Sequence, residues 1–329
     1  MNAQQRNGLY LLSLIPGLVC IAGIWMGGWF CGANLLFSLI FLGILEWILP
    51  SNESNIHSSA TATYPEFVLW LHVPLQMASI FVLLEGIFNE TIVGWDIVLA
   101  ALSTGVQAGT SAVVVAHEYI HRKNKLKKAM GLFLLFSAGN VYFYTAHLKI
   151  HHKWVGTEKD PASAKLNESL YAFFLRSVIG QIRDSYALEQ KQGKALNPIL
   201  SQIAGQIVWV LVLAGILGIG GVLAWLIHSL TAAFLLEYVN YIEHYGLNRE
   251  NNERCTEMHS WDSNKLVSRF VLVDLSRHAD HHYYASKPYH TLNAYSQGNK
   301  LPAGYAGLFF IAAIPPLWYK VIHPRISKV

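Results

Sequence analysis

Long apolar runs separated by short polar turns fill the first half of the chain, and such runs return after its middle. A helix needs roughly 20 consecutive, mainly apolar residues to cross a bilayer core. The pattern therefore predicts an all-α, polytopic integral membrane protein with six transmembrane helices. A pair of glycines, Gly220 and Gly221, marks a predicted tight turn between the last two. We expect the six helices at about residues 8–26, 31–49, 66–88, 93–116, 202–221 and 222–242.

One further apolar run, residues 129–146, is nearly long enough to span but carries small and polar residues inside it. If it crossed the membrane, the histidines of 117–121 and those of 147–152 would face opposite sides. We therefore expect this run to be re-entrant or interfacial. Residues 243–329 contain no further span, and we expect them to form a cap on the cytoplasmic side, so that 1–329 is a single membrane domain.

Composition and charge agree with membrane residence. The 329 residues are 53% hydrophobic and 13% charged, whereas a soluble domain carries about 25% charged residues. No Lys or Arg lies between Arg6 and Arg122 or between Lys194 and Arg249. With six spans both termini lie on one side, and the basic regions fall on that same side, which the positive-inside rule makes cytoplasmic. We expect contact with membrane lipid and no nucleic-acid partner.

Histidine is the residue type that stands out, with 15 copies in an apolar chain. Three clusters occur: HEYIHR at 117–122, HLKIHH at 147–152 and HADHH at 278–282. Each contains a pair spaced i, i+4, which a helix places on one face and which suits a shared metal. His244, at the end of the last predicted span, lies at the same depth. The nine candidate ligands are His117, His121, His147, His151, His152, His244, His278, His281 and His282.

Nine imidazoles exceed the four ligands of a tetrahedral site, so the pattern predicts two metal ions. Imidazole suits Zn, Cu, Fe and Ni, so the ligand type alone does not select the metal. The three cysteines form no CxxC pair and indicate neither a thiolate site nor a disulfide framework. We interpret the remaining histidines as structural: His57, His72, His228, His259, His290 and His323.

Two other functions remain open at this point. HEYIH satisfies the HExxH pattern of zinc proteases, in which Glu118 would be the general base. An intramembrane protease would leave at least six clustered histidines unexplained, and the chain has no Asp-Gly pair of the kind that such proteases use. A metal transporter would need ionisable residues along a path through the spans. The candidates for such a path are scattered: Glu46, Glu85, Asp96 and Glu237.

The order and spacing of the clusters resemble the membrane fatty-acid desaturase and hydroxylase superfamily. Three stretches are similar to the AlkB-type alkane monooxygenases, a family shared with the hydroxylase subunit of xylene monooxygenase. These stretches are NYIEHYGL at 240–247, HHKWVGTEKDPASA at 151–164 with ESLYAFFLRSVIGQ at 168–181, and RHADHHYYASKPYHTL at 277–292.

The resemblance implies a bacterial inner-membrane monooxygenase in which the nine histidines bind two non-haem irons. It implies hydroxylation of a terminal methyl group of an alkane or other hydrophobic alkyl chain with O2. A desaturase or a methyl-aromatic hydroxylase of the xylene type is the alternative. Ligand histidines usually donate their second N–H to a carboxylate or carbonyl. The acidic candidates for contact with the ligands are Glu118, Asp160, Glu237, Glu243 and Asp280.

The resemblance also implies that electrons come from a rubredoxin or ferredoxin-type carrier and its NAD(P)H reductase. The chain itself has no GxGxxG nucleotide-binding motif. The basic segment 122–128 offers a docking face for a small acidic carrier. Contact with lipid headgroups is an equally good interpretation of this segment.

Overall fold

The computed structural model describes residues 3–55, 63–193 and 196–326 and is helical almost throughout. Within these ranges the one sheet is a two-residue parallel pairing of β1 (Trp261–Asp262) with β2 (Asn299–Lys300). The predicted helical class is therefore confirmed. His57, interpreted above as structural, lies outside the described residues.

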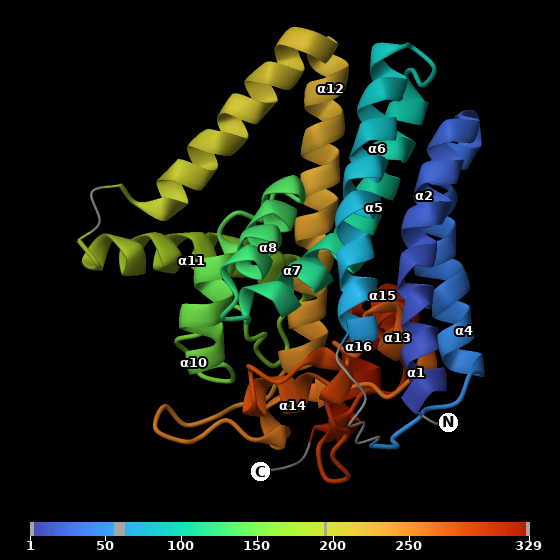
Figure 1. Ribbon diagram of the computed structural model, residues 1–329. Coiled ribbons are helices and arrows are strands. Elements are labelled where there is room, and N and C mark those ends of the chain that lie inside the picture. Colours follow the sequence, from blue (N-terminus) through green and yellow to red (C-terminus); the bar gives the residue numbers. More distant parts are fainter. Residues whose placement is uncertain (1–2, 56–62, 194–195, 327–329) are drawn as a thin grey trace.

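Within the described residues, five helical stretches are long and apolar enough to cross a membrane, which makes the chain a membrane protein. Figure 1 shows them side by side with roughly parallel axes, except for the first part of Pro198–His244, which slants away from the others. The stretches are Gln4–Met26, Gly28–Ile48, Thr63–Phe88, Trp95–Ile120 and Pro198–His244. The first stretch contains α1 (Ala3–Leu9), η1 (Tyr10–Leu14) and α2 (Ile15–Met26), and the second contains η2 (Gly28–Gly32), α3 (Ala33–Leu35), η3 (Leu36–Phe41) and α4 (Leu42–Ile48). The third is α5 (Thr63–Phe88), and the fourth contains α6 (Trp95–Gln107), η4 (Ala108–Ala112) and α7 (Val113–Ile120). The fifth is α12 (Pro198–His244).

The last stretch, α12, is 47 residues long and bends sharply at Gly218. Gly218 has φ 61° and ψ −153°, a conformation that glycine adopts without steric cost. Figure 1 shows the two arms of α12 meeting at the top of the molecule. The turn that we predicted at Gly220 and Gly221 therefore falls slightly earlier in the chain, inside one bent helix.

Tryptophans mark one end of the bundle. Trp25, Trp29 and Trp95 expose 85%, 89% and 80% of their surface near the turns that follow α2 and precede α6. Amphipathic aromatic rings are enriched where a bilayer meets water. Their exposure fits a membrane interface at this end of the bundle.

The histidine-bearing middle of the chain folds back on the bundle. Helix α8 (Lys125–Ser137) packs against α7, and the two lie side by side in Figure 1. The run 129–146 forms most of α8, the turn after it and α9 (Phe143–Thr145), so the chain returns to the level at which it left α7. The next elements are η5 (Ala146–His151), α10 (His152–Trp154) and α11 (Leu170–Lys191).

The C-terminal part packs around the opposite end of the bundle, beside the lower end of α12 (Figure 1). Its helices are η6 (Glu257–His259), α13 (Leu266–Val271), α14 (His278–Tyr283), η7 (Tyr289–Thr291), α15 (Tyr305–Ala313), α16 (Pro315–Ile322) and η8 (His323–Arg325). Helix α15 is held by α4 and α13 at its first turn. The Oε2 atom of Glu46 accepts the Gly307 N–H at 2.7 Å, and Ser268 Oγ accepts the Tyr305 N–H at 2.7 Å. These contacts satisfy N–H groups that a helix leaves unpaired at its start.

Candidate metal centre

The nine candidate histidines all lie at one place, where α7, η5, α10, α12 and α14 converge. They form two groups, and within each group the candidate ligand atoms lie within 4.8 Å of one another. Group one contains His117, His121, His147, His152 and His281; group two contains His151, His244, His278 and His282.

The ring nitrogens within each group are spaced as ligands of one ion would be. In group one, His147 Nε2 lies 3.0 Å from the Nε2 atoms of both His121 and His152. In group two, His278 Nε2 lies 2.8 Å from His282 Nε2 and 3.2 Å from His244 Nε2. An imidazole nitrogen binds zinc-like ions at about 2.0–2.1 Å, so two ligands at a right angle are separated by about 2.9 Å. The donor set therefore fits two metal ions, one for each group.

Buried nitrogens without hydrogen-bond partners support the same conclusion. The Nε2 atoms of His117 in group one and His151 in group two are buried and have no partner within the described parts of the chain. An unpaired buried polar atom is costly. A bound metal ion would give both nitrogens a partner.

The second cluster differs from our prediction. His147 and His151, spaced i, i+4, were predicted to share a metal, and this is wrong because they belong to different groups. The physical reason is that Ala146–His151 is a π-helix, in which the bonding is i to i+5. The segment therefore places His147 and His152 together in group one and leaves His151 to group two. The pairs 117/121 and 278/282 each stay within one group, as predicted.

Burial keeps these imidazoles in the form that binds metal. Burial, followed by the charges of neighbouring histidines, lowers the pKa of His147, His152, His278, His281 and His282 well below the usual range. Burial and the nearby His151 lower the pKa of His121 to about 4. Neutral imidazole is the species that coordinates a metal. The groups are therefore ready to bind ions at neutral pH.

Group two has hydrogen-bond acceptors behind its ligands. Asp160 Oδ2 lies 2.8 Å from His151 Nδ1 and accepts the Ser163 hydroxyl at 2.7 Å. Burial raises the pKa of Asp160, but the His151 charge and these hydrogen bonds outweigh it, and the net shift is downward. The backbone carbonyl of His259 lies 3.2 Å from His244 Nδ1. Such acceptors fix the tautomer and the orientation of a ligand ring.

Glu243 is the second of the five candidate acids that contacts a ligand. Its Oε2 lies 3.2 Å from His278 Nε2, and its Oε1 accepts the Tyr305 hydroxyl at 2.5 Å. Tyr305 could not be recognised from sequence, because it is distant in the chain and has no motif around it. The His259 carbonyl was also missed, because a backbone acceptor leaves no signal in residue type.

The other three acids have different partners. Glu118 pairs with Arg122 and accepts the Tyr289 N–H at 3.2 Å. Asp280 accepts the Asn293 N–H at 2.7 Å and the Tyr295 hydroxyl at 2.6 Å. Glu237 accepts hydrogen bonds from Ser177, Gln181 and Asn240, all in the buried contact between α11 and α12. Among the described residues, none of these three carboxylates has a hydrogen bond to a histidine. Glu118, the general base of the protease alternative, is instead engaged by Arg122 and by the Tyr289 N–H.

The remaining described histidines lie outside both groups. His72 lies between the hydroxyls of Ser13 and Ser111, at 2.9 and 2.5 Å. His228 Nε2 lies 2.9 Å from the Ser137 carbonyl, and His323 Nε2 lies 2.9 Å from the Tyr245 hydroxyl. His259 Nδ1 accepts the Thr256 N–H at 2.9 Å, and the ring of His290 packs edge-to-face on Tyr289.

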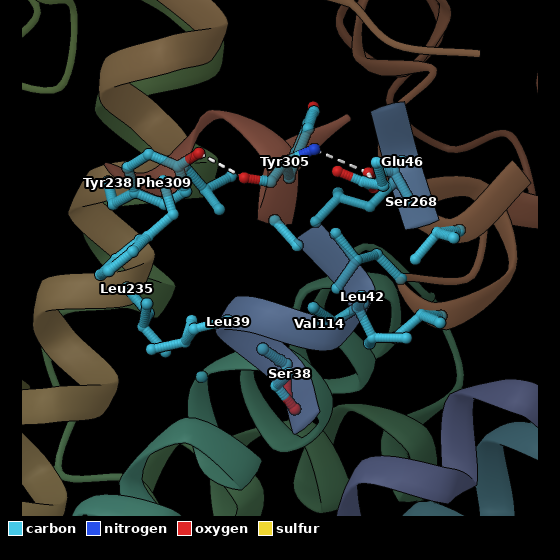
Figure 2. A pocket seen from close by; sticks show the side chains of 18 residues that line it. Ser38, Leu39, Leu42, Glu46, Val114, Leu235, Tyr238, Ser268, Tyr305 and Phe309 are labelled. Carbon is cyan, nitrogen blue, oxygen red and sulfur yellow. Dashed lines mark hydrogen bonds between the residues drawn. The ribbon is translucent and has the colours of Figure 1, made fainter. Parts of the chain in front are cut away.

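An apolar cavity leads to the histidine groups. Figure 2 shows its larger part, a pocket between α4, η4, α12, α13 and α15 with about 620 Å³ of space, including space open to solvent. Leucine, valine and phenylalanine side chains line its middle, and Glu46, Ser268 and Tyr305 gather on one side. A smaller pocket, with about 370 Å³ of space that also includes open solvent, is lined by His117, His147 and His278. The two cavities share four lining residues: Gly109, Val114, Val239 and Leu275.

Membrane-spanning helices, two histidine groups that could each hold a metal ion and an apolar cavity beside them define a membrane protein with a candidate metal centre. The family model for fatty acid desaturases matches residues 93–312, which include all nine histidines. The chain is 36% identical over 292 residues to alkane 1-monooxygenase 2 of Alcanivorax borkumensis, covering 85% of this chain and 75% of that protein. It is 30% identical to alkane 1-monooxygenase 2 of Pseudomonas aeruginosa, covering 94% and 90%. It is 23% identical to the xylene/toluene monooxygenase hydroxylase component XylM of Pseudomonas putida, covering 95% and 86%.

The chain therefore belongs to the fatty acid desaturase family and, within it, to the group of the alkane 1-monooxygenases. It is an oxidoreductase of the monooxygenase class. The family membership confirms the predicted resemblance and removes the protease and transporter alternatives.

Proposed function

We propose that the chain hydroxylates the terminal methyl group of an alkane or similar alkyl chain with O2, using two irons held by the nine histidines. The observation that carries the proposal is the apolar cavity that ends between the two histidine groups. Five histidines would bind one iron and four the other. The bound irons would supply the activation of O2, which protein side chains alone do not provide.

The side chains around the irons would do three things. Asp160 and the His259 carbonyl would hold the rings of His151 and His244 in the orientation that metal binding requires. Val114, Val239 and Leu275 would keep water out and hold an extended alkyl chain with its end at the histidines. The Glu243 carboxylate, hydrogen-bonded by Tyr305, would be the acidic group nearest to the reacting end of the chain.

Electrons would come from a rubredoxin or ferredoxin-type carrier and its NAD(P)H reductase. Two group-one histidines, His121 and His152, are only partly buried, so this group lies nearest to the surface. Arg122, Lys123 and Lys153 follow these histidines in the chain, and Lys123 is exposed. An acidic carrier would approach this basic surface with electrostatic guidance.

We further propose that α12 crosses the membrane twice, once with each arm, which gives six spans. The basic residues then lie on the side of the histidine groups, as the positive-inside rule expects for a bacterial cytoplasmic membrane. In this arrangement 129–146 is re-entrant or interfacial and 243–329 caps the cytoplasmic end of one domain.

The test is a product analysis with the purified protein, a rubredoxin, its NAD(P)H reductase and O2. The substrates are linear alkanes of graded length together with toluene and xylene. We expect a primary alcohol from an alkane, and no product from a His278→Ala variant that is present in equal amount. If the only product contained a new double bond, the chain would be a desaturase and not a hydroxylase. If only the aromatic methyl groups reacted, the chain would be a methyl-aromatic hydroxylase.

A further inference from the structure

Helix α11 has an apolar stripe that is more than half exposed in the described part of the protein, although the Tyr171 hydroxyl donates to the Ala313 carbonyl at 2.9 Å. Figure 1 shows α11 lying across the direction of the spanning helices, below the first arm of α12. Tyr171, Leu175 and Ile179 follow one another at intervals of four, on one face of the helix, and expose 52%, 61% and 64% of their surface. Phe173 and Ser177 are buried on another face, against the rest of the protein. A helix in this position, with one apolar face free, is typical of one that lies in a membrane interface.

A polar pocket opens beside this apolar stripe. It holds about 1030 Å³ of space, including space open to solvent, between α11 and the loop that follows α10. Its lining contains four basic residues, Lys159, Lys165, Arg176 and Arg183, and two acidic ones. Ile179 lines the same pocket, so the pocket and the apolar stripe are continuous.

The four cations have different roles. Arg176 is already engaged: it pairs with Glu168 at 2.6 Å and donates to the carbonyls of Pro161 and Ser163 at 3.0 Å, which fixes the loop on α11. Arg183 is exposed over 73% of its side chain, and its Nε atom donates to Asp184. The guanidinium of Arg183 has further N–H groups beyond this one donor.

The two lysines complete the rim of the pocket. The ammonium group of Lys159 lies 4.3 Å from the ring centre of Trp154, and that of Lys153 lies 4.8 Å from the same ring. Lys165 is exposed. Tryptophan with neighbouring lysines is the combination that anchors a protein at the headgroup level of a bilayer.

We propose that this pocket binds the headgroup of an anionic phospholipid, with Lys159, Lys165 and Arg183 around its phosphate and the acyl chains along Tyr171, Leu175 and Ile179. The cations of the lining outnumber its two carboxylates, Glu158 and Asp184, which favours an anionic group at the pocket, and the exposed stripe favours apolar chains along the helix. A soluble anion would match only the first of these two features. Because Asp160 lies in the same loop, a bound lipid would also steady the side chain that contacts His151.

The experiment is native mass spectrometry of the full chain with phosphatidylglycerol or phosphatidylcholine. We compare the wild type with a K159Q/K165Q/R183Q variant and with an R254Q/K320Q/R325Q control, which removes equal charge from other exposed positions. We expect tighter retention of phosphatidylglycerol than of phosphatidylcholine by the wild type and the control. The first variant should bind phosphatidylglycerol at least about tenfold more weakly, since each cation near a membrane surface contributes about 1 kcal/mol.

Three results would overturn the proposal. They are equal retention of phosphatidylglycerol by the two triple variants, equal retention of the two lipids by the wild type, and displacement of phosphatidylglycerol by inorganic phosphate at the same concentration. A separate Ile179→Ser variant keeps every cation and should also retain less phosphatidylglycerol. Unchanged retention by that variant would contradict the placement of the acyl chains. None of these readouts depends on bound metal or on hydroxylase activity.

Discussion

His151 and His152 are adjacent in the chain, and their side chains belong to different histidine groups. Their ring centres lie 6.1 Å apart, with His151 directed to group two and His152 to group one. Successive residues of a helix point in different directions. Because adjacent residues supply ligands to both groups, this dipeptide sets the distance between the two proposed metal positions.

Replacing either residue should remove one metal rather than both. We expect His152→Ala to lose metal from group one and His151→Ala to lose metal from group two, each with loss of activity. Metal content by mass spectrometry should fall from about two ions per chain to about one. His290→Gln is the control, because His290 lies outside both groups, and it should retain the wild-type content. A loss of all metal in both single variants would argue against two separately held ions.

The contact between Asp160 and His151 should tune the affinity of group two. Asp160→Asn keeps the size of the side chain but removes its charge. We expect metal affinity to fall by about 10–100-fold at one of the two positions, the usual effect of losing an acceptor behind a ligand histidine. Competition with a chelator measures this effect. Asp184→Asn, a change at a half-buried carboxylate on α11, is the control, and equal metal release from both variants would show that Asp160 does not act through His151.

Much of the metal centre could be predicted from sequence, but its division into groups could not. The nine histidines were recognisable because clustered imidazoles are rare in an apolar chain. Their division depends on the π-helix at Ala146–His151, which no local sequence feature indicated. Asp160 and Glu243 contact ligand histidines, whereas Glu118 and Asp280 do not, although all four acids are close to ligands in the chain. Orientation of these acids is set by distant partners such as Tyr289 and Tyr305, which pattern analysis does not reveal.

The passage between the two cavities should control which chain lengths react. Val114 lines both cavities, so Val114→Phe should narrow the passage. We expect kcat/KM to fall by about tenfold or more for long alkanes and much less for short ones, because a blocked chain cannot place its end at the histidines. Phe309→Ala, at the wall of the larger cavity only, should extend the range toward longer chains. An equal loss for all lengths in Val114→Phe would contradict this path.

The metal-free protein should lose stability as the solution becomes acidic. Burial lowers the pKa of His121 to about 4, whereas an unfolded histidine titrates near 6.5. Between these values the unfolded chain binds more protons than the folded one, so stability rises with pH across this window and falls as pH drops through it. Thermal unfolding of metal-free protein in detergent should show Tm decreasing from pH 7 to pH 5. A Tm that stays constant or rises as the pH falls would contradict the conclusion that the buried imidazoles are neutral.

The first turn of α15 offers a test of the fold around the cavity. Ser268→Ala removes the acceptor of the Tyr305 N–H while leaving the volume nearly unchanged. Loss of such a capping contact costs about 1 kcal/mol. We expect a Tm lower by a few degrees and retention of both metals. Ser54→Ala, in an exposed turn, is the control and should leave Tm unchanged. A Ser268→Ala variant as stable as that control would show that the Ser268 hydroxyl does not cap α15.

Each histidine group should hold one iron in the active protein. Diffraction data from the purified, active protein, collected on both sides of the iron absorption edge, locate these ions. We expect two anomalous peaks of iron, one among His117, His121, His147, His152 and His281 and one among His151, His244, His278 and His282. A single peak, or peaks that appear only at the zinc edge, would contradict this expectation.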